Sequence, residues 1–171
     1  MKTLDQIALE LQGYDPQALS ADDVLVFLSK LVTPIDEPIE LPLFDAFGRV
    51  LACDVVSPFD VPPHDNSAMD GYAFNGQQLR TASNAAFELK VIGTALAGKA
   101  WQGVVQTSEC VKIMTGAVMP KGLDTVVPQE MVSVQGDCIT FSTKALNAGD
   151  NRRLRGEDLL QGKAALLKGE L

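Results

Sequence analysis

Histidine is nearly absent from this chain, and that absence excludes several kinds of chemistry. His64 is the only histidine among 171 residues, and the cysteines Cys53, Cys110 and Cys138 form no Cys-x-x-Cys pair. A structural zinc site needs more ligands of these kinds, and a catalytic triad needs a histidine beside its nucleophile. No Gly-x-Ser-x-Gly, P-loop or dinucleotide-binding glycine motif is present either. We therefore expect His64 to stabilise its loop, and any chemistry to depend on electrostatic positioning.

Long apolar runs are also missing. No stretch reaches the roughly 18 residues that a membrane helix needs, and the N-terminus lacks the apolar core of a signal peptide. These features favour a cytoplasmic protein with no membrane partner. An odd number of widely spaced cysteines is typical of reduced thiols, which we expect to be buried as small apolar side chains.

Positive charge is scarce and unevenly distributed. The net charge is −8; residues 1–89 carry 4 basic and 14 acidic side chains, whereas residues 90–171 carry 10 and 8. Duplex nucleic acid binds to basic stripes, and the sequence has none, so we expect no nucleic-acid partner.

One local basic patch remains for anion recognition, formed by Arg152, Arg153 and Arg155. A guanidinium group can bind two oxygens of a phosphate or another oxyanion at once. The alternative is a solvated cluster of ion pairs with the adjacent Glu157 and Asp158.

The beginning of the chain predicts two helices. Capping-box patterns occur at Thr3 with Gln6 and at Ser20 with Asp23. The second pattern is followed by an apolar stripe that predicts a helix over residues 21–32 and has to be buried against another element. The stripe consists of Val24, Leu25, Phe27, Leu28, Leu31 and Val32.

Short alternating segments replace the helical pattern after residue 38 and predict a β-rich body. The predicted strands cover residues 39–44, 72–74, 87–92, 110–114, 124–134, 138–141 and 164–167, with a hairpin turn at 135–137. Residues 50–56 are a candidate passage from a helix into a strand. The expected fold is α+β and predominantly β, elongated, with short N-terminal helices before a domain of short mixed strands. We divide it into a helical or extended arm (1–44), a β-rich domain (45–158) and a returning segment (159–171) that packs on the arm.

The polar loop in residues 62–74 is the most informative part of the chain. Two prolines fix the backbone at its entry, and the carboxylates of Asp65 and Asp70 follow. Asp70 precedes a glycine, and such a dipeptide is typical of turns because glycine tolerates positive φ. An ionised carboxylate at a rigid turn can bind Mg²⁺, with water and phosphate oxygens completing the shell. The alternative is a surface turn whose polar side chains bond their own backbone.

Further donors lie in this loop and after a later predicted strand. Asn66 and Ser67 can donate to a phosphate or another oxyanion, and both also suit turn chemistry. Thr115 and Gly116 follow the strand at 110–114, where a hydroxyl and successive backbone N–H groups can face an anion as a nest. A threonine and a glycine at a strand end also occur for structural reasons alone.

Four ordered segments resemble the N-terminal region of one enzyme family. They are residues 47–58, 62–74, 112–117 and 151–158, which contain Asn-Ser-Ala-Met-Asp-Gly-Tyr-Ala, Lys-Ile-Met-Thr-Gly-Ala and Arg-Gly-Glu-Asp. These segments are similar to signature motifs of the molybdopterin molybdotransferases, the MoeA-type enzymes whose eukaryotic relatives include gephyrin. The resemblance covers Leu19 to Leu171, and nothing in it resembles the family's later α/β molybdopterin-binding domain.

The resemblance implies a reaction in which molybdate is inserted into adenylylated molybdopterin with release of AMP, and it implies Mg²⁺ as a cofactor. By the same resemblance, the catalytic residues are expected to be Asp70, Thr115 and Asp158, with Asp70 as the Mg²⁺ ligand. The residues expected to bind substrate or anions are Asn66, Ser67, Gly116, Arg152, Arg153, Arg155 and Glu157.

The resemblance also implies a homodimer in which the pterin-binding domain of the other protomer completes each cleft. We therefore expect the 171 residues alone to fold without catalysing the reaction. The alternative function is a non-catalytic dimerisation or scaffold module of the same family.

Overall fold

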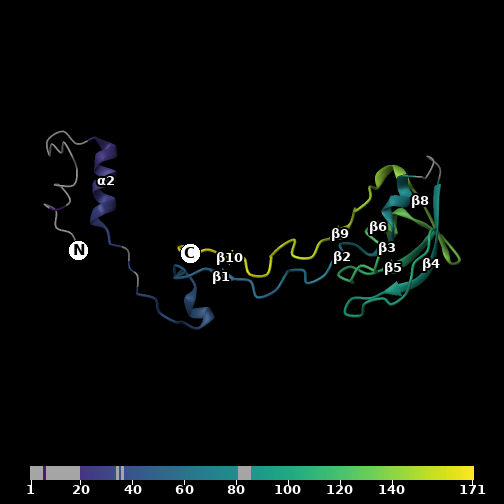
Figure 1. Ribbon diagram of the computed structural model, residues 1–171, viewed down its shortest axis with the longest axis horizontal. Helices are drawn as coiled ribbons and strands as arrows, with labels where there is room; N and C mark the ends of the chain where they lie inside the picture. The colour runs from purple at the N-terminus through teal and green to yellow at the C-terminus, as the bar shows by residue number, and fades with distance from the viewer. Residues whose placement is uncertain (1–5, 7–19, 34, 36, 81–85) are drawn as a thin grey trace. The chain divides into compact units, whose positions relative to one another are not determined.

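The structure, a computed structural model, describes residues 6, 20–33, 35, 37–80 and 86–171 (Figure 1). The chain divides into two compact units, one formed by Met1–Ala52 with Leu171 and the other by Cys53–Glu170. Among the described helices, none has the length and apolar character needed to cross a membrane.

The main element of the first unit is helix α2 (Ala21–Leu31), which begins at a capping box as predicted. The Asp23 N–H donates to the Ser20 hydroxyl, and the Ser20 N–H donates to the Asp23 carboxylate. No residue of α2 is buried, and Leu25 and Leu28 are 65% and 48% exposed. Packing of α2 on residues 159–171 would join the two units and stays a prediction.

Residues 39–44 do not form the predicted strand. The 3₁₀ helix η1 (Leu43–Ala46) occupies part of this segment, and Pro42 is its N-cap. Proline has no N–H for a strand ladder, and its fixed φ suits the start of a helical turn. The strand prediction is therefore wrong here. The helix predicted to begin at Thr3 lies outside the described residues, apart from Gln6.

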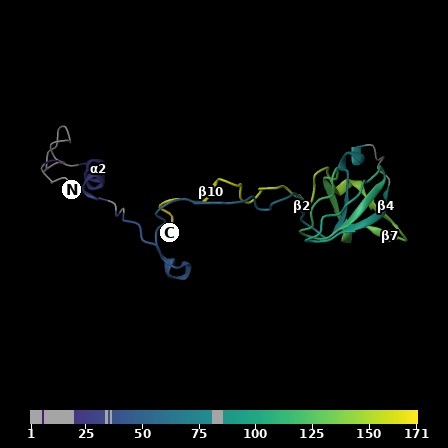
Figure 2. The same ribbon diagram turned by 60° about the horizontal axis from the view of Figure 1, so that its bottom comes forward.

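A curled, mixed sheet of six strands forms the body of the second unit (Figures 1 and 2). The order is β6-β3-β5-β4-β8-β7; β4 and β5 pair in parallel, and the other neighbours are antiparallel. The strands are β3 (Gly71–Phe74), β4 (Ala86–Ala95), β5 (Glu109–Ile113), β6 (Thr125–Pro128), β7 (Ser133–Gln135) and β8 (Cys138–Ser142). This sheet confirms the predicted β-rich fold. The single strand predicted over 124–134 is two strands separated by the 3₁₀ helix η3 (Gln129–Met131).

Hydrophobic clusters lie on both faces of this sheet. Side chains alternate along β3, so Tyr72 and Phe74 belong to one cluster and Ala73 to the other. In the first cluster the rings of Phe74, Phe87 and Phe141 lie 5.5 to 6.2 Å apart. The buried members of the first cluster are Tyr72, Phe74, Leu89, Cys110, Val127, Ile139, Phe141 and Leu146. Those of the second are Ala73, Ala95, Val111, Ile113, Ala117, Met119, Leu123 and Val126.

Two short antiparallel ribbons join segments that are far apart in sequence. Strand β1 (Val55–Val56) pairs with β10 (Ala164–Leu166), and β2 (Asn66–Ser67) pairs with β9 (Arg152–Arg153). The sequence did not predict β2 or β9, because two residues are too few to show alternation. Two further 3₁₀ helices in the described part of the chain are η2 (Gly76–Arg80) and η4 (Thr143–Ala145).

The three cysteines are free thiols, but they are not all buried. Burial, with smaller contributions from Cys138 and Glu109, raises the pKa of the Cys110 thiol to about 12. Cys138 is half-buried and Cys53 is exposed. The expectation of burial was wrong for Cys53, which lies before β1 and outside both clusters of the sheet.

Candidate functional site

The Asp70 carboxylate is fixed by Thr115 where β3 begins and β5 ends. Asp70 Oδ1 accepts hydrogen bonds from the Thr115 hydroxyl at 2.6 Å and from the Thr115 N–H at 2.7 Å. These two bonds lower the pKa of Asp70 from its ordinary value of 3.8, and the charge of Lys112 adds a smaller contribution. The structure therefore brings two of the three predicted catalytic residues together, with Asp70 ionised at neutral pH.

Gly71 is required by close packing. A Cβ at this position would lie 2.1 Å from the Val127 carbonyl oxygen on β6. The backbone of Gly71 does not have the positive φ that the Asp-Gly pattern suggested. Its role is to let β6 approach β3 directly beside Asp70.

The turn at Thr115 and Gly116 does not form an open anion nest. The Thr115 N–H donates to Asp70, the Gly116 N–H to the Ser67 carbonyl at 2.8 Å, and the Ala117 N–H to the Met114 carbonyl at 2.9 Å. Gly116 has a φ of 79°, which favours glycine. The predicted nest is therefore wrong, because acceptors within the chain already occupy these three donors.

Ser67 and Asn66 differ in how far their polar groups are satisfied. Ser67 is only 1% exposed, and its hydroxyl donates to the Met69 carbonyl at 2.6 Å. This geometry favours a role for Ser67 in holding the loop. Asn66 Oδ1 and Arg152 Nε are both buried without a hydrogen-bond partner in the described chain. Such groups are rare in folded proteins, so each is a candidate contact for water or a ligand.

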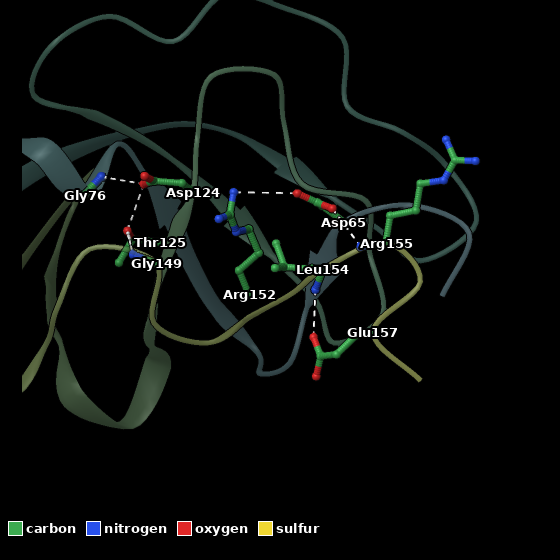
Figure 3. A network of polar contacts seen from close by, with 9 residues as sticks. All are labelled: Asp65, Gly76, Asp124, Thr125, Gly149, Arg152, Leu154, Arg155 and Glu157. Atoms are coloured by element: carbon green, nitrogen blue, oxygen red, sulfur yellow. Dashed lines mark hydrogen bonds and ion pairs between the residues drawn. The ribbon is translucent and has the colours of Figure 1, made fainter. Parts of the chain in front are cut away.

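Arg153 is held by two carboxylates of its own segment. It forms a short ion pair with Asp158 and a longer one with Glu157 at 3.6 Å. The hydrogen bond and charge of Asp158 raise the pKa of Arg153. Glu157 also accepts a hydrogen bond from the Leu154 N–H at 2.8 Å (Figure 3). Asp158 thus lies beside Arg153, and no hydrogen bond links Asp158 to Asp70 among the described residues.

The carboxylate of Asp65 lies between two of the predicted arginines (Figure 3). Its Oδ1 accepts from the Arg155 N–H at 2.8 Å, and its Oδ2 faces Arg152 Nη1 at 3.6 Å. The Arg155 side chain bonds Asp60 Oδ2 at 2.5 Å. The pKa of Asp60 is lowered, first by the Gln161 N–H and then by Arg155. Asp60 was missed in the sequence because its partners lie about a hundred residues away and leave no local pattern.

A second polar network holds the connector that leads into β9 (Figure 3). Asp124 Oδ1 accepts from the Gly76 N–H at 2.7 Å and from the Thr125 hydroxyl at 2.8 Å. The same Thr125 oxygen accepts from the Gly149 N–H at 2.9 Å. Because Thr125 lies on β6, this network ties the connector to the sheet shortly before Arg152.

The residues present can supply part of a Mg²⁺ shell. Asp70 Oδ1 is occupied by Thr115, whereas Oδ2 has no hydrogen bond within the described residues. No group of three or more His, Cys, Asp or Glu side chains in that part of the chain has the geometry to hold a metal ion. Mg²⁺ commonly binds through one or two carboxylates plus water and substrate phosphates. The free Oδ2 of Asp70 is compatible with this mode of binding, and a role for Asp70 as a Mg²⁺ ligand stays a prediction.

Comparisons with known proteins agree on one family. The family model described as the MoeA N-terminal region, domains I and II, matches residues 19–171. The molybdopterin molybdenumtransferase of Haemophilus influenzae is 38% identical over 145 residues, which cover 82% of this chain and 35% of that protein. The enzyme of the same name from Synechococcus elongatus is 39% identical over 132 residues, covering 76% of this chain and 32% of that one.

A solved structure supports the same assignment. The crystal structure of the molybdopterin biosynthesis moeA protein from Pyrococcus horikoshii superposes with a TM-score of 0.69 at 38% identity, over 78% of this chain and 35% of that one. The chain thus spans about a third of the length of the relatives it matches.

Proposed function

Because this chain belongs to the family of MoeA N-terminal regions, we propose that it supplies part of the active site of a molybdopterin molybdenumtransferase. The proposed reaction is insertion of molybdate into adenylylated molybdopterin with release of AMP, in molybdenum-cofactor biosynthesis. Because the matched relatives are about three times as long, the remaining part of the cleft is assigned to residues outside this chain, in a homodimer. The chain alone is expected to be inactive.

The observation that carries the proposal is the Asp70–Thr115 pair. Both donors of Thr115 converge on one oxygen of Asp70, which keeps the carboxylate ionised and limits its rotation. The free oxygen is then available in a fixed position, and preorganised charges need no rearrangement when substrate charge develops. Mg²⁺ held by this Asp70 oxygen would neutralise the negative charge of a substrate phosphate and polarise the bond to the leaving group.

The arginine cluster supports a binding role in the same region, because β9 pairs with β2 and the Ser67 carbonyl on β2 accepts from the Gly116 N–H next to Thr115. Arg152 retains a buried Nε without an acceptor, and its ion pair with Asp65 is 3.6 Å long. Arg152 therefore has a donor without an acceptor in the described chain and only a long ion pair, which supports a role in binding an oxyanion. Arg153 holds the carboxylate of Asp158 in place, so Asp158 is presented with a fixed orientation.

The test is a chimera that joins this chain to the rest of the Haemophilus influenzae relative. Expressed in a bacterium without its own transferase, the chimera should restore the activity of molybdenum enzymes. Asp70→Asn should abolish most of that activity, whereas Asp137→Asn, a matched change in the exposed β7–β8 turn, should not. Activity of Asp70→Asn within about twofold of the parent would reject the assignment. A folded, dimeric chimera without activity would instead favour the scaffold function.

A further inference from the structure

The end of the sheet that carries Asp70 also carries a lysine on the same face. In the antiparallel pair of β3 and β5, Gly71 lies opposite Ile113 and Tyr72 lies opposite Lys112. Side chains alternate between faces, so Lys112 shares the face of Tyr72, and Asp70, two residues earlier, belongs to that face as well. Diagonal neighbours across such a ladder are within reach of a long side chain. In agreement, Lys112 is the cation whose charge acts on Asp70.

Lys112 differs from the arginines because its ammonium group is not paired with a carboxylate of the described residues. It is half-buried, and no carboxylate in the described part of the chain forms an ion pair with it. Arg153 and Arg155 are each held by a short ion pair, and Arg152 faces Asp65. An anion that approaches Asp70 is repelled by its carboxylate, and an uncommitted ammonium on the same face offsets that repulsion.

We propose that Lys112 binds a tetrahedral oxyanion beside Asp70, either a phosphate group of the nucleotide-linked substrate or molybdate. This inference rests on the proposed function, because it names the residue that receives the negative charge of the substrate. In this proposal the two opposite charges have different roles. Asp70 would bind the Mg²⁺ that accompanies the substrate, and Lys112 would bind an oxygen of the anion. Lys112 is the first residue of the motif segment 112–117, but the sequence analysis assigned no role to it.

The experiment measures oxyanion binding to the chain without turnover. The chain is titrated with inorganic pyrophosphate and, separately, with molybdate, and the backbone N–H signals of Asp70 and Thr115 are followed by NMR. The variants are Lys112→Gln, Lys112→Arg and the matched control Lys121→Gln, which removes one exposed lysine near the opposite end of β3. Thermal unfolding of each variant verifies that the fold is kept.

We expect Lys112→Gln to weaken binding by about tenfold, the loss typical of one charge-assisted contact, while Lys112→Arg and Lys121→Gln bind as the wild type does. A response to pyrophosphate alone identifies the phosphate group, and a response to molybdate alone identifies molybdate. Three results would overturn the proposal: no binding to the wild type in the millimolar range, unchanged binding to Lys112→Gln, or equal weakening by both glutamine variants. Lys112-dependent binding together with an inactive chimera would reject the proposed reaction and leave this anion site in place.

Discussion

The buried hydroxyl of Thr125 offers a sharp test of how the connector to β9 is held. Thr125 is 0% exposed; its hydroxyl donates to Asp124 and accepts from the Gly149 N–H. Thr125→Val keeps the shape of the side chain and leaves the Gly149 donor without its partner. An unpaired buried polar group costs about 1–3 kcal/mol, and because Gly149 is half-buried we expect the lower part of this range, about 1–2 kcal/mol. At about 4 °C per kcal/mol for a unit of this size, the melting temperature should fall by roughly 4–8 °C.

The measurement can follow the single tryptophan of the chain. Trp101 packs closely against Gly93 of β4, so its fluorescence reports on the sheet. Thr125→Ser should keep most of the stability because it keeps the hydroxyl. Thr140→Val on β8 is the matched control, since the Thr140 hydroxyl makes no hydrogen bond among the described residues. A melting temperature for Thr125→Val within about 1 °C of the wild type, or an equal loss in the control, would refute the reasoning.

Three further predictions concern single positions. Gly71→Ala should lower the melting temperature and reduce stability by about 1–3 kcal/mol, the usual cost of overpacking, because its Cβ meets a neighbouring carbonyl oxygen at 2.1 Å; an unchanged melting temperature would contradict this. Thr115→Val should raise the pKa of Asp70 toward 3.8, as measured by carboxyl NMR titration. Because folding depresses this pKa, the stability that the ionised carboxylate contributes is present above pH 3.8 and is lost as the pH falls through the folded value, so the cost of Thr115→Val should shrink in acid. An alkylating reagent at pH 8 should label the exposed Cys53 and spare Cys110 until the protein unfolds, and early labelling of Cys110 would show that its burial is wrong.

The sequence predicted correctly those elements that depend on interactions between residues close together in the chain. The capping box of α2 and the alternation of Phe87 to Ile92 each lie within a few residues, and both elements are present. The short strands β2 and β9 exist because distant segments pair, with Asn66 opposite Arg153. No local pattern can reveal such a pairing, since its stability comes from the partner strand.

In the candidate site, too, residues within a motif were predictable, whereas contacts between distant segments were not. Asp70 and Thr115 were found through their motifs, and the structure places them in contact. The partners of the arginines were not predictable, because the contact of Arg155 with Asp60 depends on how two remote loops meet. The supposed nest at Thr115 was misjudged for a related reason: the carbonyl that occupies the Gly116 N–H belongs to Ser67, in another loop.

The two ribbons of the second unit have a consequence for the order of folding. In the sheet, paired residues are as near as Gln135 and Cys138 and as far apart in sequence as Gly71 and Pro128. The ribbons join residues that are still farther apart, Val56 to Ala164 and Ser67 to Arg152. Closing a longer loop costs more chain entropy, and contacts between distant residues form later. We therefore expect the sheet to form first and the ribbons to close last. In a newly synthesised chain, Asp70 and Thr115 would then be in contact before β9 pairs with β2 and positions Arg152 and Arg153. The chain would therefore gain the ability to bind its anionic substrate only in the last step of folding.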